Sequence, residues 1–198
     1  RPPRSTLFPY TTLFRSLPCN AFGATADCSG EVVFNTGMVG YPESLTDPSY
    51  TGQILVLTYP LVGNYGVPAL ELDKHGLPVG FESARIHVTG LVVSELCTDY
   101  SHYRAAKSFS QWLAEQGVPA VWGVDTRALT KKLRECGTML GRISSQLVDK
   151  PYSDPNAENL VARVTCTRRQ VLCSSAPAST RPARILLKIG RASCRERV

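Results

Sequence analysis

The sequence predicts a mixed α/β domain, in which strands in the first half of the chain are followed by two helices. In Gln53 to Thr58 (QILVLT), every residue after Gln53 is Leu or β-branched. Such an unbroken run is typical of a strand buried on both faces. Ser101 to Gln116 and Asp125 to Cys136 instead place apolar residues at helical spacing. Strands and helices combined in this order indicate a mixed α/β architecture.

Shorter apolar runs predict the remaining strands. These runs are Glu31 to Phe34 (EVVF), Ile86 to Val93 (IHVTGLVV) and Pro119 to Gly123 (PAVWG). Met38 to Tyr50 and Tyr59 to Pro68 lie between strands and contain several Gly and Pro residues. Both segments are therefore predicted to be structured loops.

Each predicted helix has a start and a stop signal. Ser101 is the candidate N-cap of the first helix, and Gly117 ends it. Asp125 or Thr126 caps the second helix, which Gly137 ends, and the basic residues of its C-terminal half suit the helix dipole. The apolar stripes consist of Ala105, Phe109, Trp112 and Leu113 in the first helix, and of Ala128, Leu129 and Leu133 in the second.

The two ends of the chain do not read as protein sequence. Thr6 to Ser16 (TLFPYTTLFRS) and Ile189 to Val198 (IGRASCRERV) can be encoded by a single oligonucleotide read in its two orientations. That oligonucleotide is a common sequencing adapter, and two unrelated protein termini would almost never satisfy this relation. We therefore interpret residues 1–16 and 189–198 as non-native, adapter-derived segments.

Setting these segments aside removes the strongest electrostatic signal. The whole chain has a formal net charge of +6, and the two ends carry five of those charges. The near-neutral remainder argues against nucleic acid or an anionic membrane surface as a partner. No apolar run reaches the roughly 18 residues of a membrane-spanning helix. The remaining cysteines form no CxxC pair, so we expect reduced thiols in a cytoplasmic protein.

Few residues suggest chemistry on their own. His87 and His102 have no nucleophile or carboxylate at a recognisable spacing and are predicted to be structural. A Cys97–His102 thiolate pair is the catalytic alternative, but no oxyanion loop accompanies it. The glycines form no phosphate-binding loop. Asp125-Thr126-Arg127 is interpreted as a helix cap beside a surface arginine.

Longer stretches carry a family resemblance that covers Phe22 to Ile143 and continues more loosely through Asp154 to Val164. They are GEVVFNTGMVGYPE (Gly30–Glu43), LTDPSY (Leu45–Tyr50), QILVLTYPLVGNYGVP (Gln53–Pro68) and GVDTRALTKKLRECGTMLGRI (Gly123–Ile143). Together they closely resemble the N-terminal domain of the small, glutamine-using subunit of carbamoyl-phosphate synthase. YPLVGNYGVP and FES (Phe81–Ser83) are most similar to the form fused into the multifunctional pyrimidine-synthesis protein of animals and fungi.

The resemblance implies a part of an enzyme that makes carbamoyl phosphate from glutamine, bicarbonate and two ATP. In the family, this domain docks a class I glutaminase, which has a Cys, a His and a Glu, onto a synthetase part that receives the ammonia. ATP and magnesium are used in that synthetase part, so no cofactor is expected in this fragment. The sequence contains no GxCxGxQ elbow, and we expect the fragment itself to be inactive, with no catalytic and no metal-binding residue.

One ligand contact follows from the resemblance. In the family, the Ser of the DPSY motif reaches the glutamine pocket, which assigns L-glutamine binding to Ser49 in this sequence. A neutral hydroxyl suits the polar end of an amino acid, because it can donate and accept without adding charge. The alternative role of Ser49 is to close an ST-type or Asx-type turn. For the whole chain, the alternative is a stand-alone interaction module that binds a synthetase-like partner without catalysis.

The resemblance also predicts a three-layer β/β/α fold and the domain boundaries. Residues 17–148 form the N-terminal domain, residues 149–184 a Pro/Ser-rich linker, and residues 185–188 the start of the truncated glutaminase domain. The family's N-terminal strand, which would precede Phe22, is replaced by the adapter-derived segment. We therefore expect that strand to be missing and the edge of its neighbour to be unpaired.

Overall fold

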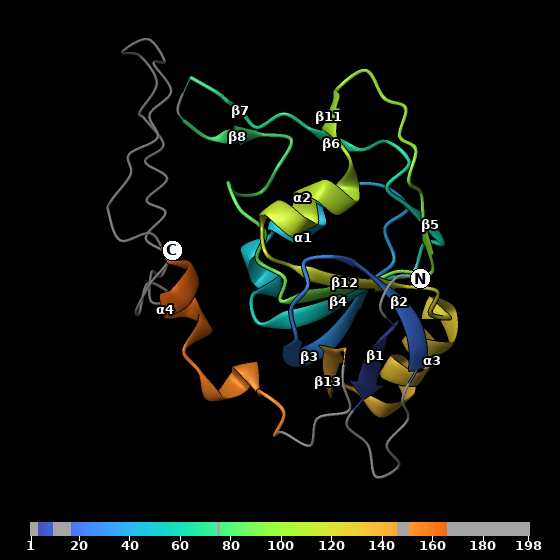
Figure 1. The fold of residues 1–198 in the computed structure, drawn as a ribbon. Coiled ribbons are helices and arrows are strands. Elements are labelled where there is room, and N and C mark those ends of the chain that lie inside the picture. Colours follow the sequence, from blue (N-terminus) through green and yellow to red (C-terminus); the bar gives the residue numbers. More distant parts are fainter. Residues whose placement is uncertain (1–3, 10–16, 75, 146–150, 166–198) are drawn as a thin grey trace. The chain divides into compact units, whose positions relative to one another are not determined.

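The computed structural model describes residues 4–9, 17–74, 76–145 and 151–165 (Figure 1). The chain divides into two compact units, Arg1–Pro155 and Asn156–Val198. The first unit holds the sheet and the helices that pack on it. The candidate site lies entirely within this first unit.

A curled sheet closes into a barrel in the strand order β1-β13-β3-β4-β9-β12-β2. Its strands are β1 (Arg4–Pro9), β2 (Leu17–Gly23), β3 (Cys28–Asn35), β4 (Gln53–Leu57), β9 (Gly90–Val92), β12 (Pro119–Trp122) and β13 (Met139–Ser144). The central strands β3, β4, β9 and β12 are parallel to one another, and the remaining pairs are antiparallel. The predicted mixed α/β class is confirmed.

Strand β4 separates two apolar cores, as its unbroken apolar sequence predicts. Ile54 and Val56 face the core that contains α3 (Thr126–Cys136), whereas Leu55 and Leu57 face the core that contains α1 (Tyr41–Thr46) and α2 (Phe109–Glu115). Successive side chains of a strand point to opposite faces, which produces this division. Figure 1 shows α1 and α2 on one side of the barrel and α3 on the other.

Short two-stranded ladders shape the loops above α1 and α2. β5 (Leu61–Val62) pairs with β10 (Glu95–Leu96), and β6 (Val67–Pro68) pairs with β11 (Ala105–Lys107). β7 (Glu71–Leu72) and β8 (Pro78–Val79) form an antiparallel hairpin. Because β5 and β6 lie within Tyr59–Pro68, these ladders fix the backbone of the segment that was predicted to be a structured loop.

The helices correct two of the expectations. α1 lies inside Met38–Tyr50, which was predicted to be a loop, because a distant tyrosine rather than a neighbouring residue satisfies its first N–H groups. α2 begins after Ser108, whose hydroxyl accepts from Gln111 N at 3.2 Å, and not after Ser101. α3 follows the prediction, with Asp125 as N-cap and Gly137 at its end.

The expectation of a missing N-terminal strand is wrong. β1 lies within the segment that the sequence marks as adapter-derived, and it pairs antiparallel with both β2 and β13. No edge is therefore left unpaired at this place. Strand pairing uses backbone N–H and C=O groups, so a segment that contains Thr, Leu and Phe can form the ladder whatever its origin.

The second unit contains α4 (Leu160–Val164), which Asn159 caps through its side chain. The predicted linker residues 149–184 are described only in part, and a short 3₁₀ turn, η2 (Pro155–Ala157), lies among them. The predicted glutaminase strand at residues 185–188 lies outside the described residues. Among the described helices, none is long and apolar enough to cross a membrane.

The close approach of β3 and β4 generates a first prediction. A Cβ at Gly30 would overlap the backbone carbonyl oxygen of Gly52, which cannot move aside cheaply. We expect Gly30→Ala to lower the free energy of unfolding by about 1–3 kcal/mol, measured by urea denaturation.

Gly37→Ala provides the control, because a Cβ there would lie 3.1 Å from the side-chain oxygen of Asn35 and 3.4 Å from the backbone oxygen of Val39, whereas at Gly30 it would lie 2.3 Å from the oxygen of Gly52. We expect a change within about 0.5 kcal/mol for this variant. Equal effects of the two substitutions would contradict the strand spacing described above.

Candidate functional site

Ser49 lies in a short 3₁₀ turn, η1 (Pro48–Tyr50), between α1 and β4. The Asp47 carboxylate accepts from Ser49 N at 2.8 Å, and the Thr51 hydroxyl donates to Pro48 O at 2.7 Å. The turn is therefore closed by Asp47 and Thr51, and the Ser49 hydroxyl is not needed to hold it. Ser49 is exposed, so the structure presents a hydroxyl on a fixed backbone.

Two further contacts attach this turn to the fold. The Thr51 hydroxyl lies 3.1 Å from Nδ1 of His87. Because that hydroxyl donates its own proton to Pro48 O, it can only accept from His87, which places a proton on Nδ1. On the other side of the turn, Asn35 Nδ2 donates to Ser44 Oγ at 3.0 Å and to Tyr50 Oη at 3.5 Å.

The opposite end of α1 is held by a pair of stacked tyrosines. Tyr65 Oη accepts from the backbone N–H groups of Gly40 at 2.9 Å and Tyr41 at 3.1 Å, and Tyr41 Oη donates to Gly66 O at 2.7 Å. Their rings stack with centroids 4.2 Å apart. Burial raises the pKa of both phenols, so both remain protonated and the hydrogen bonds persist at ordinary pH.

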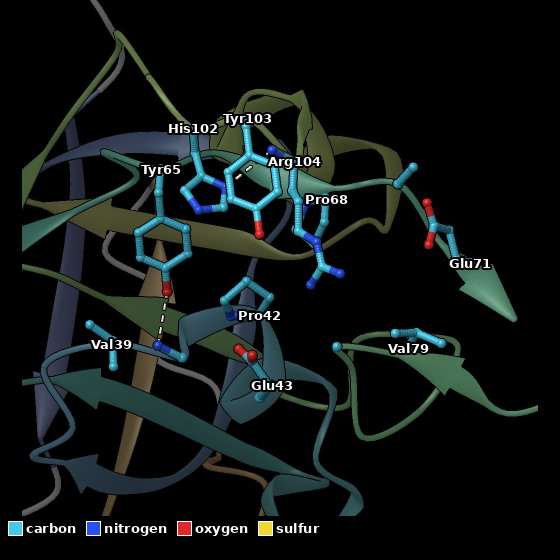
Figure 2. Close-up of a pocket in the computed structure, with 13 residues that line it drawn as sticks. Val39, Pro42, Glu43, Tyr65, Pro68, Glu71, Val79, His102, Tyr103 and Arg104 are labelled. Carbon is cyan, nitrogen blue, oxygen red and sulfur yellow. Dashed lines mark hydrogen bonds between the residues drawn. The ribbon is translucent and has the colours of Figure 1, made fainter. Parts of the chain in front are cut away.

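A pocket of about 590 Å³ opens beside this tyrosine pair (Figure 2). Glu43 of α1, Tyr65, the segment His102–Arg104 and the β7–β8 hairpin contribute to its walls. One carboxylate oxygen of Glu43 is buried and has no hydrogen-bond partner among the described residues. Sequence reasoning missed this pocket, because its residues come from four separate segments and match no motif.

The structure does not support the Cys97–His102 pair. The Cys97 thiol donates to Asp99 O at 2.8 Å, and Nδ1 of His102 accepts from Arg104 N at 3.2 Å. Each side chain is thus bonded to nearby backbone rather than to the other. The interpretation of both residues as structural fits these contacts.

The remaining candidates are also structural where the chain is described. Asp125 accepts from Ala128 N at 2.9 Å, which confirms the predicted cap, and Arg127 is exposed. In the part of the chain that the structure describes, Cys19, Cys28, Cys97 and Cys136 form no disulfide, and burial raises the pKa of Cys28 to about 12. Within the described ranges, no group of three His, Cys, Asp or Glu residues could hold a metal ion.

Comparisons with known proteins agree on one family. The model of the carbamoyl-phosphate synthase small chain, CPSase domain, matches residues 15–143. The chain is 55% identical over 153 residues to multifunctional protein CAD of Squalus acanthias, covering 76% of this chain and 7% of that protein. It is 53% identical over 165 residues to multifunctional protein URA2 of Saccharomyces cerevisiae, covering 73% of this chain and 8% of that protein.

A separate small chain is similar as well. The arginine-specific small chain of carbamoyl phosphate synthase from Saccharomyces cerevisiae is 49% identical over 172 residues, covering 86% of this chain and 42% of that protein. The chain thus spans less than half the length of each of these relatives. The match includes the DPSY turn and the tyrosine pair, because both lie inside residues 15–143.

The environment of His87 generates a prediction about pH. Burial and the nearby Arg85 lower the pKa of His87 below its usual value. The unfolded imidazole takes up a proton near pH 6.5, before the folded one does, so the unfolded state binds more protons as the pH falls through this region. We expect the free energy of unfolding to decrease between about pH 7.5 and 5.5, measured by urea denaturation at each pH.

His87→Asn is the comparison variant, because the asparagine amide can still donate to Thr51 but does not titrate. Its stability is expected to fall less over the same pH interval. A variant with the same pH dependence as the unsubstituted chain would show that His87 is not the responsible group.

Proposed function

Because the chain belongs to the carbamoyl-phosphate synthase small-chain family, we propose that it is a piece of a glutamine-hydrolysing carbamoyl-phosphate synthase. The parent protein would be a ligase that uses glutamine-derived ammonia to make carbamoyl phosphate. This piece would adopt the family's three-layer β/β/α arrangement and dock a glutaminase onto a synthetase. It would not hydrolyse glutamine itself, because its sequence contains no cysteine elbow.

The observation that carries the role of Ser49 is the closure of its turn by other groups. A hydroxyl that closed the turn would be occupied, whereas the Asp47 carboxylate and the Thr51 hydroxyl make the contacts here. The exposed Ser49 hydroxyl can therefore be offered to the polar end of glutamine. An interaction module without catalysis would give no reason for a hydroxyl held in this way.

The bridging role is supported by a second surface at the other end of α1. Met38, Val39, Tyr59 and Leu61 line one hollow beyond the carboxyl ends of β3 and β4, and their exposed fractions are 70%, 77%, 39% and 37%. Exposed apolar side chains gathered in this way are typical of a contact surface. Ser49 lies in the turn that precedes the amino end of β4, so the domain presents two separate faces, as a bridge between two partners requires.

We assign the Ser49 face to the glutaminase and the apolar surface Met38–Val39–Tyr59–Leu61 to the synthetase. This assignment follows from the glutamine role of Ser49, since a hydroxyl that reaches glutamine must face the domain that binds glutamine. L-glutamine and the two protein parts are then the partners of this chain. No role with ATP or magnesium is assigned to its residues.

Ser49→Ala in the intact enzyme tests the glutamine contact. Loss of one hydrogen bond to a charged substrate group is expected to raise the glutamine KM about tenfold. Ammonia-dependent synthesis of carbamoyl phosphate should be unchanged, because ammonia bypasses the glutamine pocket. Both rates are measured by steady-state kinetics.

Ser49→Thr keeps the hydroxyl and is expected to retain most of the affinity for glutamine. Ser101→Ala removes an exposed hydroxyl elsewhere and should leave the glutamine KM unaltered. If Ser49→Ala also leaves it unaltered, the glutamine role is wrong and the interaction module without catalysis becomes the better reading.

Val39→Glu tests the docking surface, because it places a charge at the most exposed of its four side chains. A charge buried against a partner without a counter-ion is costly. We expect the intact enzyme to keep its glutamine hydrolysis but to make severalfold less carbamoyl phosphate for each glutamine consumed. The measurement is the ratio of the two products.

Val161→Glu, at an exposed valine of α4, is the matched control and should preserve this ratio. Unchanged coupling in Val39→Glu would remove the apolar surface from the synthetase contact.

A further inference from the structure

We propose that the pocket between Glu43 and Arg104 binds a small zwitterion of the α-amino acid class, with its ammonium at Glu43 and its carboxylate at Arg104. The pocket measures about 590 Å³, and small-molecule sites in proteins commonly occupy about 300–1,000 Å³. Ser49 is not among its lining residues. The proposal therefore stands on observations independent of the glutamine role of Ser49.

The first observation is the state of the Glu43 carboxylate. Its Oε2 atom is buried and has no hydrogen-bond partner among the described residues. Burying a carboxylate oxygen without a donor costs free energy. A rotation of the Glu43 side chain toward the pocket would let a bound N–H group recover that free energy.

The second observation is the cation that faces this carboxylate without touching it. Figure 2 shows the Glu43 carboxylate and the Arg104 guanidinium pointing into the same space from opposite sides. In the described part of the chain, the ion pairs are Lys107–Glu115 and Arg163–Glu158, so Glu43 and Arg104 do not pair. Two opposite charges separated by a hollow complement a ligand that carries both charges.

Aromatic rings form one wall of the same hollow. His102 lies between Tyr65 and Tyr103, with ring centroids 6.2 Å and 4.6 Å from theirs. Nδ1 of His102 accepts from Arg104 N, so the neutral ring carries its proton on Nε2 and remains a donor. With Pro42 and Val79 also lining the pocket, the space between the two charges suits an apolar or aromatic side chain.

The third consideration is the position of Arg104. Its guanidinium lies 5.9 Å from the centroid of the Tyr103 ring, which restricts its orientation while leaving its donors available. Glu71 also lines the pocket, and both Glu71 and Arg104 are exposed, so water screens their charges more than that of the half-buried Glu43. A site for a simple cation would use the carboxylates of Glu43 and Glu71 and would gain nothing from Arg104. The experiment must distinguish this hypothesis from the zwitterion site.

Three related probes separate the two charges in the full chain. L-phenylalanine carries an ammonium and a carboxylate, phenethylamine only the ammonium, and 3-phenylpropionate only the carboxylate. We expect saturable binding of L-phenylalanine in calorimetric titration, at least about tenfold tighter than either single-charge analogue. Equal binding of phenethylamine would reduce the pocket to a cation site, and absence of saturation with all three would overturn the proposal.

Two substitutions complete the test, and each variant is measured with all three probes. Glu43→Gln is expected to weaken the binding of L-phenylalanine and phenethylamine about tenfold and to leave the binding of 3-phenylpropionate unchanged. Arg104→Met should weaken the binding of L-phenylalanine and 3-phenylpropionate and leave the binding of phenethylamine unchanged. Glu95→Gln and Arg85→Met change matched exposed charges outside the pocket and should change none of the three affinities. If Glu43→Gln does not fold, Arg104→Met and the three probes still distinguish the zwitterion site from a cation site. Uniform weakening of all three probes in the pocket variants would contradict the assigned orientation.

Discussion

The hydroxyl of Tyr65 fixes the start of α1, and the rest of the candidate site depends on that contact. Gly40 precedes the helix in a left-handed conformation with φ of 82° and offers no side chain as a cap. Tyr65 supplies the missing acceptor by taking the N–H groups of both Gly40 and Tyr41. A six-residue helix is marginal on its own, because nucleation costs more than so few hydrogen bonds return. The tyrosine pair therefore decides that this segment is a helix.

The consequence is that α1 acts as a short spacer between two surfaces. It spans about 9 Å along its axis, between the pocket at its first turn and the Ser49 turn beyond its last residue. Because β3 and β4 are parallel, the chain must cross from the end of one to the beginning of the other. The crossover places Glu43 and Ser49 at different edges of the barrel, where they can face different ligands or partners.

The barrel and these loops are held together in different ways. Its ladders are formed by backbone groups, and β1 completes it even though the sequence of that segment reads as adapter-derived. The loops depend instead on individual side chains. Asp47 closes the Ser49 turn, Thr51 joins that turn to His87, and Tyr41 ties α1 to Gly66. The proposed ligand contacts thus lie where single hydrogen bonds, rather than sheet pairing, hold the backbone.

Local sequence was enough to predict the mixed α/β class, the buried strand at Gln53–Leu57, the Asp125 cap and the family, because these depend on neighbouring residues or on long ordered strings. It did not reveal α1, the later start of α2 at Phe109, or the pocket of Glu43 and Arg104. Each of these results from contacts between distant segments: Tyr65 reaches α1 across 24 positions, and Arg104 faces Glu43 only after the loops fold over the barrel. Local sequence pattern carries no signal for such contacts, because they form only when the folded chain brings the segments together.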